Sequence, residues 1–173
     1  MVTPTPRAPS ATPLEEELRR LAGSVPDPEL PMVSLADLGV VRELRILAPG
    51  RVEVELTPTY TGCPALESMA ADIEAVLHER GIPEVAVRTV LSPPWTTDAI
   101  SAEGRRKLAE AGIAPPSPGR ASAGGPVPVA LTVRCPHCGS TETTLLSRFS
   151  STACKALRRC EACREPFDHF KEL

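Results

Sequence analysis

Residues 51–77, RVEVELTPTYTGCPALESMAADIEAVL, combine two periodic patterns that together predict a helix packed on a sheet. Over 51–56, valine and leucine alternate with arginine and glutamate, as in a strand that buries one face. Beyond the GCP sequence at 62–64, apolar side chains recur with the spacing of an amphipathic helix. These side chains are Leu66, Met69, Ala70, Ile73, Val76 and Leu77. Because proline is favoured in the first turn of a helix, we expect this helix to begin at Pro64.

The flanking sequence supplies partners for both elements. Residues 40–47 can form a strand, and the Pro-Gly turn at 49–50 joins it to the next strand as a hairpin. Residues 85–91 predict a third strand, which the intervening helix allows to pair in parallel with one of the first two. A capping box of Thr12 and Glu15 opens an earlier helix. The expected fold class is α+β, with a small α/β sandwich of the αββαβ type whose helices cover one face of the sheet.

Composition divides the chain into four parts. Prolines, serines and threonines predict a disordered segment at 1–12 and a Pro/Gly/Ser linker at 114–128. The α/β domain is expected at 13–113, with a last helix over 101–111, and a second domain resembling a zinc ribbon is expected at 129–173. A chain of 173 residues is long enough for one ordinary domain and one small one.

Two Cys-x-x-Cys pairs, CPHC at 135–138 and CEAC at 160–163, predict a metal centre in the second domain. Four thiolates on two tight turns can enclose one tetrahedral ion, and a zinc site without an open position is structural rather than catalytic. We expect zinc to be bound by Cys135, Cys138, Cys160 and Cys163. Iron in a rubredoxin-like centre is the alternative, and disulfides are the lesser one in a reducing compartment. His137 and Cys154 are placed outside the ligand set.

The remaining sequence argues against several classes of function. Without a secretory leader a cytoplasmic location is expected, and no apolar run approaches the ~20 residues that span a bilayer. Aromatic residues make up only 3% of the chain and the tail is mildly basic, which argues against nucleic-acid binding. A Gly-rich phosphate loop, a nucleophile elbow and an H-E-x-x-H helix are all missing, so an enzyme is not expected.

Cys63 is the residue outside the tail that is best placed for chemistry. It precedes the predicted helix, where free backbone N–H groups and the helix dipole favour an anion, so its thiol is expected to ionise easily. A small N-cap without function explains this position equally well. Asp27 and Glu29, in a proline-rich loop, could assist a metal or bind a partner, although acids in such loops are more often solvated. Trp95 either belongs to a contact surface or closes the edge of the core.

Longer motifs give the chain a family resemblance. They are VPDPELPMVSLADLGVV at 25–41, TPTYTGCPA at 57–65, SPPWTTDAIS at 92–101, CPHCGS at 135–140 and FSSTACKALRRCEACREPFDHF at 149–170. With these motifs the chain resembles the D subunits of phenylacetyl-CoA epoxidase (phenylacetate oxygenase) systems, the PaaD or PaaJ family. Its first domain is similar to the small iron–sulfur assembly proteins of the DUF59 type, through Asp-Pro-Glu at 27–29 and Gly-Cys-Pro at 62–64.

The resemblance implies a role in aerobic phenylacetate degradation, where a di-iron monooxygenase epoxidises phenylacetyl-CoA with electrons from an iron–sulfur flavin reductase. A member of this family would be an accessory protein that helps to mature the [2Fe–2S] cluster of the reductase or, as a second choice, the di-iron site. Cys63 would carry a transient cluster, with Asp27 and Glu29 in the same transfer or partner site. The implied partners are the epoxidase subunits and above all the reductase, and a homodimer stays open. The alternatives are a rubredoxin-like electron carrier and a purely structural adaptor in which Cys63 is inert.

Overall fold

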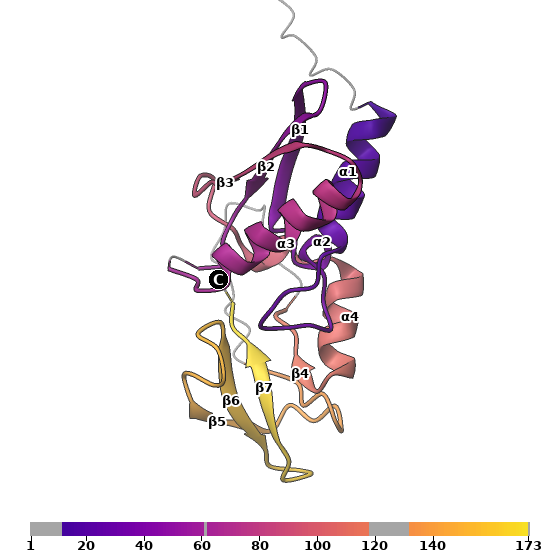
Figure 1. Cartoon of the computed structure of the whole chain (residues 1–173). Coiled ribbons are helices and arrows are strands. Elements are labelled where there is room, and N and C mark those ends of the chain that lie inside the picture. Colours follow the sequence, from indigo (N-terminus) through magenta and orange to yellow (C-terminus); the bar gives the residue numbers. More distant parts are fainter. Residues whose placement is uncertain (1–11, 61, 118–131, 173) are drawn as a thin grey trace, which may run out of the picture.

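The first part of the chain folds into a three-stranded sheet with helices packed on one face (Figure 1). This computed structural model describes residues 12–60, 62–117 and 132–172, so residues 1–11 of the predicted disordered segment and most of the linker lie outside the described residues. The elements are, in order, α1 (Pro13–Ser24), α2 (Leu35–Leu38), β1 (Val41–Ala48), β2 (Arg51–Leu56), α3 (Leu66–Glu79) and β3 (Glu84–Thr89). Strand β2 pairs antiparallel with β1 and parallel with β3, which confirms the expected αββαβ arrangement.

The turn between β2 and α3 differs from the sequence-based expectation. Helix α3 begins at Leu66 rather than at Pro64, and Ala65 caps it without any side-chain hydrogen bond. The N–H of Leu66 already donates to the carbonyl of Cys63, over 3.4 Å, so residues 63–66 form a separate turn that precedes the helix. Cys63 therefore lies at the corner between strand and helix, but not directly at the helix terminus.

The core of this domain lies between the sheet and two helices. Leu18 of α1, Ile73 and Leu77 of α3, and Val54 of β2 are fully buried in one apolar cluster. Burial of each such side chain stabilises the fold by about 1.5–3 kcal/mol. This layer fixes β2 against α3, and hence the position of the corner that contains Cys63.

After β3 the chain crosses to the second domain through η1 (Thr97–Ala99) and α4 (Ala102–Glu110). Helix α4 agrees with the helix predicted over 101–111, and the hydroxyl of Ser101 caps it by accepting the N–H of Gly104, over 2.9 Å. The indole N–H of Trp95 donates to the carbonyl of Leu38, over 2.8 Å, so this side chain closes the edge of the first core. None of the helices within the described ranges has the length and apolar character that a membrane crossing requires.

The tail forms a second sheet from β4 (Ile113–Ala114), β5 (Thr143–Ser147), β6 (Lys155–Cys160) and β7 (Pro166–Phe170). The strand order is β4-β7-β6-β5, and β4 runs parallel to β7. The two residues of β4 stand at the boundary expected between the first domain and the linker. The tail sheet thus includes β4 as an edge strand, although β4 precedes the linker in the sequence.

The tail also packs directly on the first domain. Phe170 of β7 and Cys154, just before β6, belong to the same apolar cluster as the core residues of the first domain. The Phe170 ring lies 6.1 Å from the ring of Trp95, centroid to centroid. The hydroxyl of Thr97 donates to a carboxylate oxygen of Glu172, over 3.4 Å. The sequence predicted two separate units, whereas the described residues of the two units share one core.

Candidate metal centre and interdomain cluster

The two Cys-x-x-Cys turns have matching backbone geometry. In the first, the N–H of Gly139 donates to the carbonyl of Cys135; in the second, the N–H of Arg164 donates to the carbonyl of Cys160. Gly139 has φ 76° and Arg164 has φ 68°, so each turn ends in the left-handed conformation. Arg164 is the only non-glycine residue with positive φ in the part of the chain that the structure describes, which indicates that the turn imposes this conformation.

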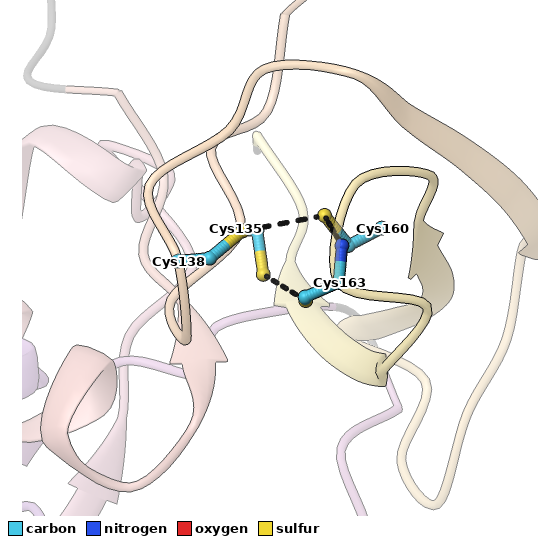
Figure 2. A group of neighbouring side chains, drawn as sticks. All are labelled: Cys135, Cys138, Cys160 and Cys163. Carbon is cyan, nitrogen blue, oxygen red and sulfur yellow. Dashed lines mark hydrogen bonds between the residues drawn. The ribbon is translucent and has the colours of Figure 1, made fainter.

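The four thiols converge on one point from these two turns (Figure 2). Their sulfur atoms all lie within 4.8 Å of one another, with Cys135 and Cys163 at 3.8 Å and Cys138 and Cys160 at 3.5 Å. A tetrahedron of sulfurs around zinc, with bonds of about 2.3 Å, has sulfur–sulfur edges of about 3.8 Å. The cysteines are not joined in disulfides. The geometry therefore fits one tetrahedral metal ion held by these four residues.

The thiols of this centre differ in their pKa values. The N–H of Cys163, above other donors, lowers the pKa of Cys160 to about 7, whereas burial and the neighbouring thiols raise the pKa of Cys138 and Cys163 despite their own backbone hydrogen bonds. Hydrogen bonds from backbone N–H groups to sulfur also reduce the charge that four thiolates place on a divalent ion. His137 is exposed and lies beside Gly112 and not among the four cysteines. This position agrees with the prediction that His137 is not a metal ligand.

Cys63 is buried at the strand-to-helix corner, with 7% of its surface exposed. Burial raises the pKa of its thiol, although the N–H of Ala65 donates to the sulfur and acts in the opposite direction. The expectation that this thiol ionises easily is wrong for the protein as it stands, because desolvation outweighs the helix terminus. This burial favours the protonated form of the Cys63 thiol.

The loop with Asp27 and Glu29 approaches the same corner. One carboxylate oxygen of Asp27 accepts the N–H groups of Glu29 and Leu30, each over 2.8 Å, so this side chain shapes its own loop. Burial raises the pKa of Asp27, and burial together with the charge of Asp27 raises the pKa of Glu29. Both carboxylates in turn act on the Cys63 thiol and raise its pKa further. The structure thus brings together Cys63, Asp27 and Glu29, which the sequence grouped only through a resemblance.

The second domain contributes to this neighbourhood two residues that the sequence did not assign to it. They are Cys154, with 4% of its surface exposed, and Lys155, with 5% exposed. The ammonium of Lys155 lies 3.1 Å from a carboxylate oxygen of Asp168. We call the set Asp27, Glu29, Tyr60, Cys63, Cys154 and Lys155 the interdomain cluster. No local pattern marks Cys154, because its neighbours here are distant in the sequence.

A small cavity of about 90 Å³ adjoins the interdomain cluster at Tyr60. Its other lining residues are Thr57, Pro58, Thr59, Leu91, Pro94 and Trp95. Burial is the main cause that raises the pKa of Tyr60 to about 12, followed by the nearby Cys63. Trp95 therefore has the second of its two expected roles, because it closes the edge of the core, and it also lines this cavity.

The two domains match two different family models. Residues 122–171 match the model described as the PaaD zinc beta ribbon domain, and residues 15–92 match the model described as iron-sulfur cluster assembly protein. A crystal structure of a DUF59 domain from Bacillus anthracis is similar to the first domain, with a TM-score of 0.51 and 28% identity. That similarity covers 54% of this chain and 90% of the other. These matches confirm the expected DUF59-type α/β domain followed by a zinc ribbon.

Relatives resemble either the whole chain or its first domain. A protein of Escherichia coli strain K12, assigned as the D component of a 1,2-phenylacetyl-CoA epoxidase, is 45% identical over 161 residues, which are 93% of this chain and 94% of that protein. An Fe-S protein maturation auxiliary factor of Porphyromonas gingivalis is 32% identical over 95 residues, covering 54% and 90%. The auxiliary factor SufT of Staphylococcus aureus is 38% identical over 78 residues, covering 43% and 85%.

Proposed function

Because the chain belongs to the PaaD family, the D subunits of 1,2-phenylacetyl-CoA epoxidase systems, we propose that it is an accessory protein that helps to mature a metal centre of such a system. The recipient that we propose is the [2Fe–2S] cluster of the reductase, with the di-iron site as second choice. The observation that carries this proposal is the buried Cys63 thiol beside Asp27 and Glu29, in a domain that matches iron–sulfur assembly proteins. The protein itself catalyses no step of the epoxidation.

Cys63 holds the iron–sulfur cargo for a limited time. Iron replaces the proton of the thiol when it binds, and the proton leaves to solvent. When a recipient cysteine takes over the iron, Cys63 regains a proton and no electron moves. The raised pKa of Cys63 suits this role, since a thiol that prefers its protonated form releases iron more readily than a strongly acidic one.

The four-cysteine centre has a different role in this proposal. We assign zinc to it, because the four ligands leave no open position and the sulfur–sulfur distances of 3.5 and 3.8 Å fit that ion. The ion fixes the turns that precede β5 and join β6 to β7, and it thereby holds Cys154 and Phe170 against the first domain. The same sulfur geometry suits iron, so a rubredoxin-like electron carrier is the second candidate function.

Metal and acid-labile sulfide analysis of anaerobically purified protein tests the proposal. We expect about one zinc per chain from a closed four-sulfur site, in the wild type and in Cys63→Ser alike. Iron and sulfide are expected in the wild type and absent from Cys63→Ser. The matched control is Ser68→Ala, which changes an exposed side chain in the first turn of α3 and leaves the thiol and its own turn in place. Iron without sulfide in all three proteins would establish the electron carrier instead.

The transfer role needs a measurement in cells. The chromosomal protein is replaced by Cys63→Ser or by Ser68→Ala, and the [2Fe–2S] content of the purified reductase is compared. We expect a reductase poor in cluster only with Cys63→Ser. A fully loaded reductase with that variant would leave the structural adaptor as the function of the protein.

A further inference from the structure

The cavity beside Tyr60 lies at the edge of the sheet where two parallel strands end. Strands β2 and β3 pair in parallel up to Leu56 and Thr89, so the chain leaves both strands at the same edge. The residues that line the cavity belong to 57–60, which follow β2, and to 91–95, which follow β3. In open α/β sheets, ligands bind beyond the carboxyl ends of the parallel strands. The cavity therefore lies where the topology of the sheet favours a binding site.

Hydrogen bonds to the first domain hold both walls of the cavity in place. The guanidinium of Arg42 donates to the carbonyl of Pro93, over 3.0 Å, and the indole N–H of Trp95 donates to the last carbonyl of α2, over 2.8 Å. On the opposite wall, the N–H of Thr57 donates to the carbonyl of Val40, over 2.9 Å. The cavity is thus formed in the free protein and does not depend on a ligand.

The cavity adjoins the turn that contains the Cys63 thiol. The N–H of Cys63 donates to the carbonyl of Tyr60, over 3.3 Å, and Gly62 between them has φ 82°, as in a tight turn. Tyr60 also packs against the apolar cluster that includes Cys63. A protein that takes over cargo from Cys63 has to approach this turn, so it meets the cavity as well.

The size of the cavity selects the kind of occupant. Its volume of about 90 Å³ is below the ~300–1,000 Å³ of pockets for small molecules and cofactors. It is also smaller than the ~150 Å³ cavity that holds benzene, which argues against a whole aromatic ring. Leu91, one of the lining residues, has 60% of its surface exposed and presents apolar surface beside the cavity. One aliphatic or polar side chain of a partner protein fits these dimensions.

The lining favours an uncharged side chain with a hydrogen-bonding end. None of the described residues that line the cavity is charged, so a carboxylate or ammonium would lose its water without gaining a counter-charge. Thr57 has 1% of its surface exposed, and its hydroxyl makes no hydrogen bond within the part of the chain that the structure describes. A hydroxyl can both donate and accept, and the amide of asparagine or glutamine offers an acceptor and two donors. Such an amide is complementary to Thr57.

We propose that this cavity is a docking pocket, in which the recipient of the cluster inserts the amide side chain of one asparagine or glutamine. This inference rests on the proposed function and adds how the recipient is held beside Cys63. Thr57 binds the amide, Pro94 and Trp95 contact its aliphatic part, and Leu91 packs against the surrounding surface of the recipient. Docking forms and breaks no covalent bond.

Binding of the purified reductase to the full chain tests the pocket. Thr57→Val removes the hydroxyl and keeps the shape of the side chain, whereas Thr57→Ser keeps the hydroxyl. We expect binding to weaken at least about tenfold in Thr57→Val and to stay near the wild-type value in Thr57→Ser. Leu91→Ala should also weaken binding. The matched control Leu47→Ala, which removes a similarly exposed leucine from β1, should bind normally.

Stability distinguishes a docking role of Thr57 from a structural one. Because its hydroxyl has no partner among the described residues, Thr57→Val should leave the midpoint of urea unfolding unchanged or raise it. A lowered midpoint would show that the hydroxyl is already bonded in the free protein and would overturn the inference.

The amide is identified from the side of the reductase. The photo-crosslinker p-benzoylphenylalanine, in place of Leu91, captures the reductase peptide that docks there. Alanine in place of the asparagine or glutamine of that peptide should weaken binding to the wild type but cause no further loss with Thr57→Val. A captured peptide without either residue, or additive losses, would overturn the inference.

Iron and sulfide content separates this inference from the proposed function. The content of Thr57→Val and Leu91→Ala should equal that of the wild type, because Cys63 is intact. Reductase binding that is unchanged in both variants, or absent from the wild type, would overturn the docking pocket and leave the role of Cys63 standing. Iron and sulfide retained by Cys63→Ser would overturn the proposed function and this inference with it.

Discussion

Replacing Phe170 by alanine should uncouple the zinc ribbon from the first domain. The Phe170 side chain is fully buried, and its ring centroid lies 6.1 Å from that of Trp95 at an interplanar angle of 52°. Truncation of a buried phenylalanine to alanine costs about 3–5 kcal/mol. Of that loss, about 0.5–1.5 kcal/mol belongs to the aromatic pair itself. A domain whose total stability is about 5–15 kcal/mol would lose a large share of it.

Trp95 provides the assay, because it is the single tryptophan of the chain and touches the substituted ring. Urea unfolding followed by its fluorescence should move to a lower midpoint in Phe170→Ala, with an emission maximum at longer wavelength before unfolding begins. Zinc content should stay at the wild-type level, since Phe170 packs in the shared core and not in the smaller cluster around the metal ligands.

Phe167→Ala is the matched control on the same strand. Phe167 is buried against Cys135 and Cys160, so its loss should speed zinc release to a chelator while the starting fluorescence of Trp95 stays unchanged. Identical effects of the two variants on Trp95 fluorescence would refute the assignment of Phe170 to the shared core and of Phe167 to the smaller cluster around the metal ligands. An unchanged midpoint in Phe170→Ala would refute the contribution of the tail to the stability of the first domain.

Three further changes have definite outcomes. Removal of the metal with a chelator should disorder the zinc ribbon and expose Trp95 to water. The circular dichroism spectrum should lose strand signal, and the fluorescence emission of Trp95 should shift to longer wavelength. An unshifted emission would contradict the packing of Phe170 on Trp95. Burial lowers the pKa of His169 to about 4 from 6.5, so the unfolded chain binds more protons at this residue between these values. The contribution of His169 to stability should be complete above pH 6.5 and fall as the pH is lowered toward 4, and the slope in urea titrations should be smaller in His169→Gln than in the wild type. Gly104→Ala would place a Cβ atom 2.8 Å from the carbonyl oxygen of Asp37, and we expect a loss of about 1–3 kcal/mol in unfolding free energy, whereas an unchanged value would mean that α4 shifts freely.

The metal centre could be predicted from the sequence because all of its information is local. Each Cys-x-x-Cys pair forms one turn, and the spacing alone places two sulfurs on the same side of that turn. Strand β2 and helix α3 could be predicted equally well from the sequence, since their apolar residues recur with clearly different periods of two and 3.6 residues. The error at Pro64 is also local: proline suits both the first turn of a helix and the turn that precedes it.

The environment of Cys63 could not be predicted, since it depends on contacts between distant segments. A position near a helix start suggests an acidic thiol, but the burial that reverses this effect comes from the shared core. Cys154 carries no signal in its own sequence, because its neighbours Glu29 and Tyr60 lie in the first domain. Likewise, no composition or period predicts that β4 pairs with a strand beyond the linker.

The parallel pairing of β4 with β7 also sets an order of events during synthesis. Strand β7 is the most C-terminal of the described strands, and it lies between β4 and β6 in the sheet. The sheet β1-β2-β3 is complete as soon as β3 has left the ribosome, whereas β4 must wait for β7 before it has a strand partner. Phe170, which belongs to that strand, completes the core of the first domain only when the strand has been added. A chain that is cut short before Pro166 would therefore leave β4 without a strand partner and the first core without Phe170.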